Sequence, residues 1–396
     1  MFSAQDQNQN NTEVIKKPLR YTIITYGCQM NVADSEEMAQ PLKDRGFVAT
    51  VDPAEADIIL MNTCTVRDQA EHRAKSNLGR LKDWKEAKPD RILIVAGCAA
   101  SRWGKYIQEK YPFIDLVWPA TQIEKFPEMI ADVLKERWNW ERETKGTFGD
   151  VGADRCPPGN TGNLFGDTRT AFITVMRGCN LTCSYCIVPQ VRGRGVSRPK
   201  AQILEDVQRK VAEGYRDAML LGQTVNQWGE PGHDFADLLR AAAAIEGVEV
   251  LRFMSPHPRF MSDRLIEAMA ACRTVARHIH LPVQTGSDRL LSSMRRLYTR
   301  PEYLDVVSKL RKAMPDILIT TDFIVGYPGE TETDFRETLS LLENVRFNGV
   351  FAFKYSPRPG TSAACCVDDV PQAVKEERLQ TVFARNRELK GETSRT

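Results

Sequence analysis

Three cysteines lie close together in the segment RGCNLTCSYC, where Cys179, Cys183 and Cys186 have the spacing CxxxCxxC. Three thiolates on one short loop can bind three irons of an iron-sulfur cube and leave the fourth iron open to another ligand. The alternative is structural zinc, which prefers four protein ligands. The nearest candidate for a fourth ligand is Cys156, in a glycine-rich stretch. We therefore favour the cube.

A second set of three cysteines is spread over the first third of the chain. Cys28, Cys64 and Cys98 follow the apolar, β-branched runs YTIITYG, DIILMNT and RILIVAG, and their spacings are 64 − 28 = 36 and 98 − 64 = 34 residues. One strand-helix unit has about thirty or more residues. A cysteine repeated once per unit falls on the same carboxyl edge of a parallel sheet, so we expect these thiols to converge. The alternative is three buried cysteines that act as small apolar side chains.

These runs alternate with polar, helical stretches, which predicts an α/β domain with a parallel, Rossmann-like sheet over residues 21–140. Within DSEEMAQPLKDRGF, Asp34 and Glu37 have the spacing of a capping box, and Pro41 predicts a kinked or interrupted helix. The charged segment VRDQAEHRAKSNLGRLKDWKEA predicts a long helix.

The rest of the chain predicts a second α/β domain. Residues 141–168 carry six glycines and a Pro-Pro pair, which indicates a linker, and residues 1–20 are expected to form a disordered tail. Six strand-like runs then alternate with helical stretches over 169–364, which predicts a partial barrel of six strand-helix units. We expect residues 365–396 to form a helical extension. Cys272, Cys365 and Cys366 are interpreted as structural.

Composition limits the function classes. Lys and Arg number 54 against 52 Asp and Glu, so the net charge of +2 cannot attract a polyanion by itself. The polar amino terminus lacks the apolar core of a secretory signal, and no run of eighteen apolar residues could span a bilayer. A cytoplasmic location is therefore expected, and clustered cysteines in that compartment more often bind metal than form disulfides.

The motifs CNLTCSYC, YGCQMNVADSE, NTCTVRDQAEHRAKSNLGRLK and TDFIVGYPGETETDF resemble the methylthiotransferases of the radical S-adenosylmethionine superfamily, most closely the bacterial MiaB type, from about Tyr21 to Leu389. The resemblance implies that Cys179, Cys183 and Cys186 hold a 4Fe-4S cluster that binds S-adenosylmethionine and cleaves it to a radical, which makes them the catalytic cysteines. It implies that Cys28, Cys64 and Cys98 hold an auxiliary 4Fe-4S cluster that supplies sulfur. The implied product is 2-methylthio-N6-isopentenyladenosine, beside the anticodon of tRNA on its 3′ side.

The resemblance also implies S-adenosylmethionine contacts, for each of which a turn glycine or a barrel-closing polar residue is the alternative. These residues are Tyr185, Gly222, Gln223, Ser255, Gly326 and Glu330. Members of this type usually continue into a small carboxyl-terminal β-barrel of the TRAM type that binds tRNA, which is expected to be absent here. The resemblance further implies an electron donor such as a flavodoxin-type protein, and we expect a monomer that does not bind membranes.

Local positive charge predicts where the anticodon arm of tRNA would bind. The segment 177–200 has five basic residues and no acidic one: Arg177, Arg192, Arg194, Arg198 and Lys200. Arg295, Arg296 and Arg300 would extend this surface, and Trp228 or Tyr355 would stack on a splayed base. The alternatives are a basic loop that folding pairs with carboxylates, and aromatic residues that belong to the core.

Three other functions remain open on the sequence alone. Two share the chemistry: methylthiolation of threonylcarbamoyl-adenosine in tRNA, or of an aspartate in a ribosomal protein. The third is of a different class, an iron-sulfur electron carrier or RNA-binding module without turnover. Electron transfer alone does not need a barrel that encloses a substrate, so we favour an enzyme.

Overall fold

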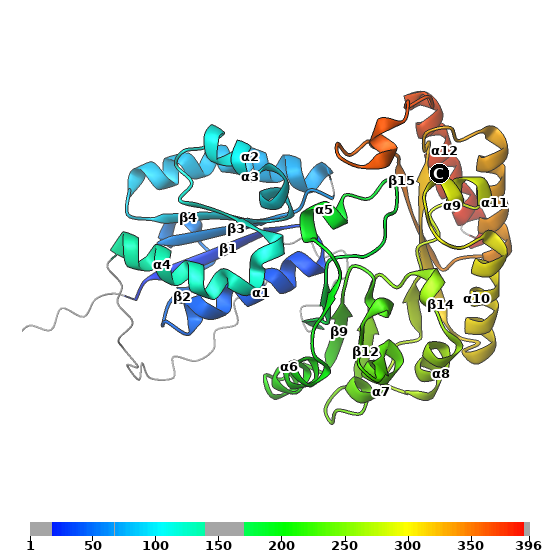
Figure 1. Cartoon of the computed structure of the whole chain (residues 1–396), viewed down its shortest axis with the longest axis horizontal. Coiled ribbons are helices and arrows are strands. Elements are labelled where there is room, and N and C mark those ends of the chain that lie inside the picture. Colours follow the sequence, from blue (N-terminus) through cyan, green and yellow to red (C-terminus); the bar gives the residue numbers. More distant parts are fainter. Residues whose placement is uncertain (1–17, 67, 139–169, 392–396) are drawn as a thin grey trace, which may run out of the picture.

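The computed structural model describes residues 18–66, 68–138 and 170–391, and within the helix that begins at Asp68 no side chain before residue 73 is described. The expected linker at 141–168 lies outside these ranges, as do residues 1–17 of the expected tail. The tail prediction extends too far, because Arg20 already belongs to the first strand. Two α/β units follow one another in the chain and lie side by side (Figure 1).

A five-stranded parallel sheet forms the centre of the first unit, in the order β2-β1-β3-β4-β5. The three expected strands are the central ones, and the sequence reading missed the two edge strands, which are short. The bounds are β1 (Arg20–Tyr26), β2 (Val48–Ala49), β3 (Ile58–Thr63), β4 (Ile92–Gly97) and β5 (Leu116–Pro119).

Helices cover both faces of this sheet, as its fully buried central strands require. Alternate residues of β3 face opposite layers: Ile58 and Leu60 pack with the helices on one face, and Ile59 and Met61 pack with those on the other. The first face carries α1 (Gln29–Lys43) and α4 (Phe126–Trp138), and the second carries α2 (Asp68–Ala87) and α3 (Cys98–Lys110).

Two expectations about α1 are wrong. The helix begins directly after Cys28, its N-cap residue, so Asp34 and Glu37 lie inside the helix and form no capping box. Pro41 does not interrupt α1, which continues through it to Lys43. The proline stands in the last turn, where the lost hydrogen bond and the ring clash affect only the end of the helix.

Six parallel strands form the second unit, at the six positions expected. They pair in two groups, β12-β9-β6 and β13-β14-β15, and an isolated parallel bridge between Leu251 and Val275 connects the groups. The bounds are β6 (Thr170–Thr174), β9 (Asp217–Leu221), β12 (Val250–Phe253), β13 (His278–His280), β14 (Leu318–Val325) and β15 (Gly349–Lys354).

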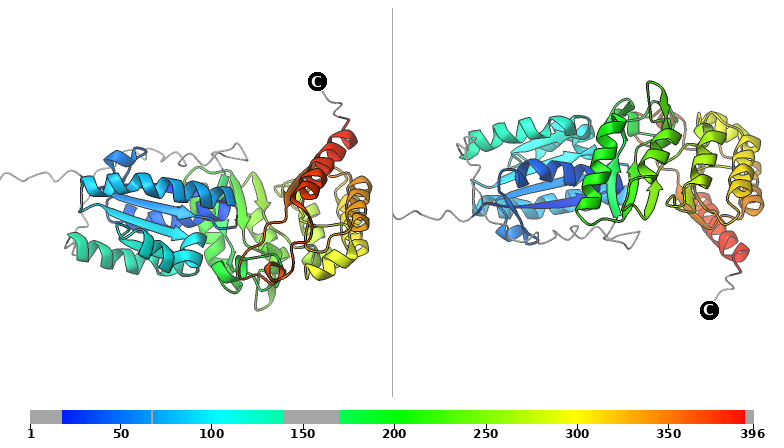
Figure 2. Two further views of the ribbon diagram at one scale, coloured as in Figure 1. Left: turned by 90° about the horizontal axis from the view of Figure 1, so that it is seen from above. Right: turned by 90° about the horizontal axis from the view of Figure 1, so that it is seen from below.

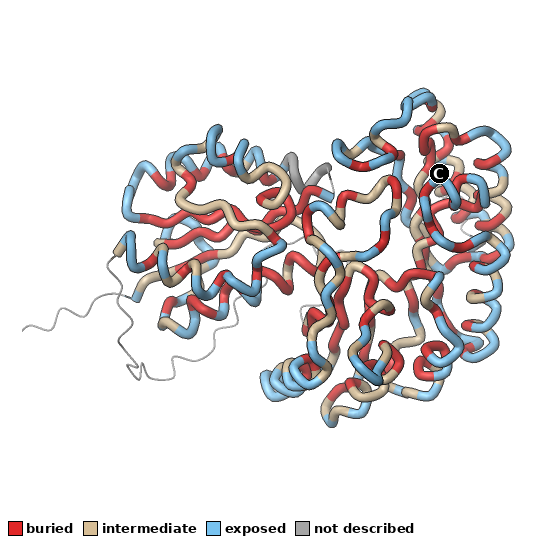
Figure 3. Tube along the Cα trace, in the orientation of Figure 1, coloured by how far each residue is buried: buried red, intermediate tan, exposed pale blue. Residues whose placement is uncertain are grey.

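Apart from the short helix α5 (Val188–Arg192), which packs on α3 of the first unit, the helices of the second unit lie on one side of these strands and enclose the largest apolar core (Figures 1 and 3). In β14 every second residue is buried against the helices, while residues between them are partly exposed on the opposite side. These helices are α6 (Lys200–Ala212), α7 (Phe235–Ala243), α8 (Asp263–Ala271), α9 (Asp288–Ser293), α10 (Arg300–Ala313), α11 (Glu332–Val345) and α12 (Gln372–Leu389).

The last helix, α12, packs on β15, β14 and α11, as the views from above and below also show (Figure 2). Lys375 on α12 is fully buried, pairs with Asp368, and lies against Gly326 at the end of β14. This helix is therefore part of the second unit.

Two further short antiparallel pairs complete the second unit: β7 (Met176–Arg177) with β8 (Val196–Ser197), and β10 (Gly229–Glu230) with β11 (His233–Asp234). Trp228 and Tyr355, considered above as base-stacking residues, are 2% and 5% exposed, so the core alternative is the one observed. No helix in the described part of the chain is long and apolar enough to span a membrane.

Candidate functional site

The first three cysteines lie at one edge of the first sheet. Tyr26, Thr63 and Gly97 are paired across β1, β3 and β4, and each of these strands reaches its cysteine within two residues of that row. The three cysteines therefore lie at the same carboxyl edge of the sheet, as expected. Cys28 and Cys64 are among the groups whose charge affects the Cys98 thiol.

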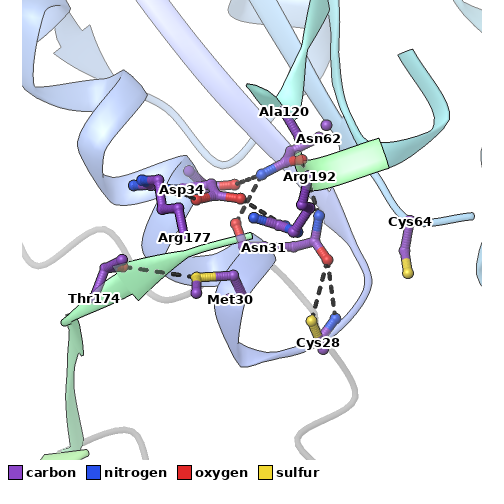
Figure 4. Close-up of polar contacts among 12 residues, drawn as sticks. Cys28, Met30, Asn31, Asp34, Asn62, Cys64, Ala120, Thr174, Arg177 and Arg192 are labelled. Atoms are coloured by element: carbon purple, nitrogen blue, oxygen red, sulfur yellow. Dashed lines mark hydrogen bonds and ion pairs between the residues drawn. The ribbon is translucent and has the colours of Figure 1, made fainter. Parts of the chain in front are cut away.

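Two buried asparagines connect α1, whose N-cap is Cys28, with β3, which precedes Cys64. Asn31 accepts from the Cys28 thiol at 3.4 Å and donates from Nδ2 to Asn62 at 3.2 Å, and Asn62 in turn donates to the Asn31 carbonyl at 2.7 Å (Figure 4). Neither asparagine is exposed to solvent. The sequence reading missed this pair, although Asn31 three residues after Cys28 and Asn62 two residues before Cys64 were visible signals.

Burial controls the protonation of Cys98. Loss of water raises the pKa of this thiol to about 12, against the opposing charge of Arg192. The thiol is therefore protonated at neutral pH in the metal-free protein, and a metal must displace that proton in order to bind sulfur.

The second set of cysteines lies on a loop that opens after β7 and is closed by main-chain hydrogen bonds. The Cys179 N–H donates to the Gly193 carbonyl at 3.1 Å, and the pairing of β7 with β8 joins the two ends of the loop. The charges of Cys179 and Cys183 both act on the Cys186 thiol, so the three residues of this set are near one another. Burial raises the pKa of Cys186 to about 12 as well.

Donors surround these sulfurs. The Leu181 N–H donates to Cys179 Sγ at 3.4 Å, and the hydroxyl of Thr224 lies 3.2 Å from the same sulfur. Arg296 Nη1 lies 3.5 Å from Cys183 Sγ and donates to the Tyr185 hydroxyl at 3.4 Å. Such donors stabilise thiolate over thiol and orient a metal-bound sulfur.

The prediction that Arg296 belongs to an RNA-binding surface is wrong, because this residue is buried. Its exposed fraction is 6%, and it also donates to the Pro282 carbonyl at 3.0 Å. Its neighbour Arg295 is exposed. Sequence alone did not distinguish the two, because the backbone at Arg295 and Leu297 adopts positive φ angles of 55° and 61° that local patterns do not predict.

The expected S-adenosylmethionine contacts lie at the carboxyl ends of the second unit's strands. Gly222 follows β9, and a Cβ there would lie 2.6 Å from Met176 Cγ, while the neighbouring Gln223 has a buried Oε1 without a partner among the described residues. Ser255 follows β12 with a positive φ of 59°. Gly326 follows β14 and donates its N–H to Glu330 at 2.6 Å.

One carboxylate oxygen of Glu330 is bound by other residues of the protein. Its Oε2 also accepts from Arg378 of α12 at 2.8 Å, whereas Oε1 has no partner in the part of the chain described. Tyr185 packs with Tyr327 and Tyr355 beside the cysteine loop. These six residues share one end of the strands, and their contacts with S-adenosylmethionine stay a prediction.

Most basic side chains of the segment 177–200 form ion pairs with carboxylates of the protein itself. Arg177 and Arg192 both pair with Asp34 of α1, and Arg177 also pairs with Glu37. Arg198 pairs with Asp206 at 2.8 Å. Folding thus brings carboxylates to these arginines, as the alternative reading foresaw. Arg194 is exposed, and Lys200 is partly exposed.

The two sets of cysteines face the same boundary between the units. Cys28 packs with Met30 and Ala33 of α1 and with Met219 and Leu221 of β9. Cys98 packs with Ile187 and Val191, which directly follow Cys186. Residues of both cysteine sets are therefore packed at the interface between the two units.

Comparison with known proteins gives the family. Residues 20–119 match the family described as "Uncharacterized protein family UPF0004", and residues 173–342 match the Radical SAM superfamily. Proteins named tRNA-2-methylthio-N(6)-dimethylallyladenosine synthase are similar over nearly the whole chain. That of Geobacter metallireducens is 46% identical over 93% of this chain and 82% of its own length, and that of Trichlorobacter lovleyi 44% over 94% and 85%.

The chain belongs to the tRNA-2-methylthio-N(6)-dimethylallyladenosine synthase family. Among solved structures, the radical S-adenosylmethionine methyltransferase TsrM from Kitasatospora setae is similar with a TM-score of 0.63, at 15% identity, over 88% of this chain and 77% of that one. At this identity the similarity confirms the α/β fold of this synthase family member.

In the described ranges, no group of three or more histidines, cysteines, aspartates or glutamates is close enough to hold one metal ion together. A cube takes each thiolate on a separate iron. The hydrogen-bond donors beside the second set of cysteines, which include the Leu181 N–H, the Thr224 hydroxyl and the Arg296 guanidinium, are of the kind that supports cluster-bound sulfur.

Proposed function

We propose that this chain converts N6-isopentenyladenosine, next to the anticodon on its 3′ side, to the 2-methylthio derivative in tRNA. Its family membership supports the reaction, and the meeting of two cysteine sets at one interface is the observation that carries the proposal. A radical enzyme that transfers sulfur needs its radical source and its sulfur source near one substrate atom.

The cofactors are two 4Fe-4S clusters and S-adenosylmethionine. We assign one cluster to Cys179, Cys183 and Cys186 and the auxiliary cluster to Cys28, Cys64 and Cys98. When bound, these groups supply the electron, the radical and the sulfur that no amino acid side chain provides. The chain itself orients the sulfurs through Thr224 and Asn31, and places Arg296 and Arg192 beside them.

We divide the chain into a methylthiotransferase domain at 21–140 and a radical domain at 169–364, to which α12 adds, and we infer that the six parallel strands form a partial barrel open toward the first unit. We further propose a cytoplasmic monomer, reduced by a flavodoxin-type donor, which holds the anticodon arm near Arg194 and Lys200.

Anaerobic turnover tests the reaction. The full chain, reconstituted with iron and sulfide, is incubated with a reductant, S-adenosylmethionine and an anticodon-arm RNA that carries N6-isopentenyladenosine. We expect 5′-deoxyadenosine and the 2-methylthio nucleoside, both lost in Cys183→Ala. Arms with threonylcarbamoyl-adenosine RNA and with a ribosomal protein test the related substrates. Intact S-adenosylmethionine in the reduced wild-type protein would overturn the enzyme assignment.

A further inference from the structure

The carboxylate of Asp34 lies at the boundary between the two units and is completely buried, at 0% exposure. It stands on α1, six residues after Cys28, so the same helix carries a proposed cluster ligand at its N-cap and this carboxylate in its second turn. A buried carboxylate is costly unless it is paired, so its partners decide what it does.

Both partners of Asp34 come from the other unit, and they flank the second cysteine loop. Arg177 precedes Cys179 by two residues, and its Nη1 donates to Asp34 Oδ1. Arg192 follows Cys186 by six residues, and its Nη2 donates to Asp34 Oδ2 at 2.8 Å. Figure 4 shows the two arginines converging on this one side chain.

The two arginines keep the buried Asp34 carboxyl ionised. Burial raises the pKa of the Asp34 carboxyl, but the charges and hydrogen bonds of Arg192 and Arg177 outweigh it and hold the pKa below its usual range. The arginine side chains are 12% and 4% exposed, for Arg177 and Arg192 respectively. These three buried charges, together with Glu37, which also pairs with Arg177, give a contact of fixed geometry that a surface pair does not.

Arg192 also reaches the first set of thiols. Its charge acts on Cys98 and Cys28, and its Nη1 is buried without a partner among the described residues. One guanidinium therefore binds Asp34 and also acts on two thiols of the first set, and it keeps one buried N–H group without a partner in the described ranges. Asp34 is thereby connected to both cysteine sets, through α1 and through Arg192.

We propose that Asp34 is a positioning residue that fixes the distance and orientation between the two cysteine loops by holding Arg177 and Arg192 on either side of the second loop. This inference rests on the proposed function, because the distance matters only if sulfur from one site must meet a radical made with the other. A displacement of about 1 Å at such a site can lower the rate about a hundredfold.

The experiment compares Asp34→Asn and Asp34→Glu with the wild type and with Asp206→Asn. Asp206 is a matched control, because it also pairs with two arginines, Arg198 and Arg209, but only within the second unit. Three quantities are measured on the reconstituted full chain: iron per chain, the ratio of 5′-deoxyadenosine to 2-methylthio nucleoside, and the spin-spin interaction between the two reduced clusters by pulsed electron paramagnetic resonance.

In Asp34→Asn we expect full iron content and 5′-deoxyadenosine within about twofold of the wild type, but at least about tenfold less methylthio nucleoside. The spin-spin interaction changes as well. Asp34→Glu keeps the charge and shifts the contact by one methylene, so it restores part of the coupling. Asp206→Asn behaves as the wild type.

An unchanged product ratio and spin-spin interaction in Asp34→Asn at full iron content would overturn the positioning role. If Asp34→Asn instead loses iron and both products together, Asp34→Glu decides: at full iron content, an unchanged ratio and an unchanged spin-spin interaction there, although the contact is shifted by one methylene, overturn the proposal. Failure of the proposed function is a different result: wild-type protein that cleaves S-adenosylmethionine yet forms no methylthio nucleoside.

Discussion

At the scale of single residues, buried cations stand beside the proposed ligand sulfurs. Arg192 is 7% exposed and acts on Cys28 and Cys98, and Arg296 is 6% exposed and lies beside Cys183. A cation in a site of low dielectric stabilises negative charge more than one in water does. Cluster reduction adds one negative charge, so each arginine favours the reduced state of its neighbour.

Arg296→Met is expected to make the cluster of the second cysteine set harder to reduce, because it removes this cation and keeps the length of the side chain. The reduction potential falls by tens of millivolts, where about 59 mV corresponds to a tenfold change in a one-electron equilibrium. A redox titration followed by electron paramagnetic resonance measures it, in protein whose first cysteine set is replaced by alanine. Arg295→Met, at the exposed neighbour, is the control and leaves the potential unchanged. Equal shifts in both variants would contradict this role.

His257 gives the protein a specific acid sensitivity. Burial, reinforced by the charge of Arg296, lowers the pKa of this imidazole from its ordinary 6.5 to about 2. Between pH 6.5 and 2, His257 binds a proton in the unfolded chain but stays neutral in the folded protein. Its contribution to folding stability is therefore fully present above pH 6.5 and is lost progressively as the pH falls toward 2. At pH 5.5 the loss from this group is about 1.4 kcal/mol.

His257→Asn tests this sensitivity and keeps an acceptor for the Arg259 N–H, which the imidazole now caps. Urea unfolding at pH 7.5 and 5.5 gives the difference in stability between the two pH values, in which the cost of the smaller side chain cancels. We expect that difference to shrink by about 1.4 kcal/mol relative to the wild type. If the free energy of unfolding changes by the same amount between pH 7.5 and 5.5 in His257→Asn as in the wild type, this histidine does not have a lowered pKa.

At the scale of elements, the turns that follow the central strands place the first cysteine set. Gly97 ends β4 and is the N-cap of α3, whose first residue is Cys98. Its φ of +97° lies in the region that favours glycine, and a Cβ there would lie 2.3 Å from Asn62 Oδ1 and 2.4 Å from the Thr63 carbonyl. The backbone of β3 occupies this space, so the contact cannot relax by rotation of a side chain.

Gly97→Ala is therefore expected to destabilise the first unit by at least about 1–3 kcal/mol and to lower the iron bound there. Gly79→Ala is the control: this glycine lies within α2 with nothing within 4 Å of an added Cβ. It gains about 0.8–1.0 kcal/mol from helix propensity. The stability of both variants is measured as the urea midpoint, and their metal binding as iron per chain. The second cysteine set is replaced by alanine in both, so that only iron at the first set is counted. A Gly97→Ala protein with unchanged midpoint and iron would contradict the packing described.

The sequence predicted the elements that repeat and missed what depends on tertiary contacts. The three central strands of the first sheet and all six strands of the second unit were predictable, because each is a run of mostly apolar, often β-branched residues, whether it is buried throughout, as β3 and β4 are, or only in part, as β1 and β15 are. The start of α1 was not, because its N-cap is Cys28 and the charges of Asp34 and Glu37 serve arginines more than 130 residues away in the chain. For the same reason a stretch without carboxylates looked like an open basic surface.

At the scale of the whole molecule, the charges nearly balance, with a net charge of +2. Ion pairs across the boundary between the units remove Arg177 and Arg192 from the charge available to RNA. Long-range attraction of tRNA is therefore weak, and the salt dependence of binding reports a few local phosphate contacts. Arg194 is an exposed cation beside Gly193, whose carbonyl accepts from the Cys179 N–H at the closed end of the second cysteine loop.

Arg194→Gln is accordingly expected to weaken the salt dependence of RNA binding by the equivalent of one phosphate contact. For a single-stranded anticodon loop, the slope of log affinity against log salt becomes about 0.7 smaller in magnitude. Filter binding of an anticodon-arm RNA at several salt concentrations measures this slope. Arg336→Gln, at an exposed arginine on α11, is the control and keeps the wild-type slope. Equal slopes for Arg194→Gln and the wild type would place the phosphates elsewhere, because a side chain that neutralises no phosphate releases no counterion.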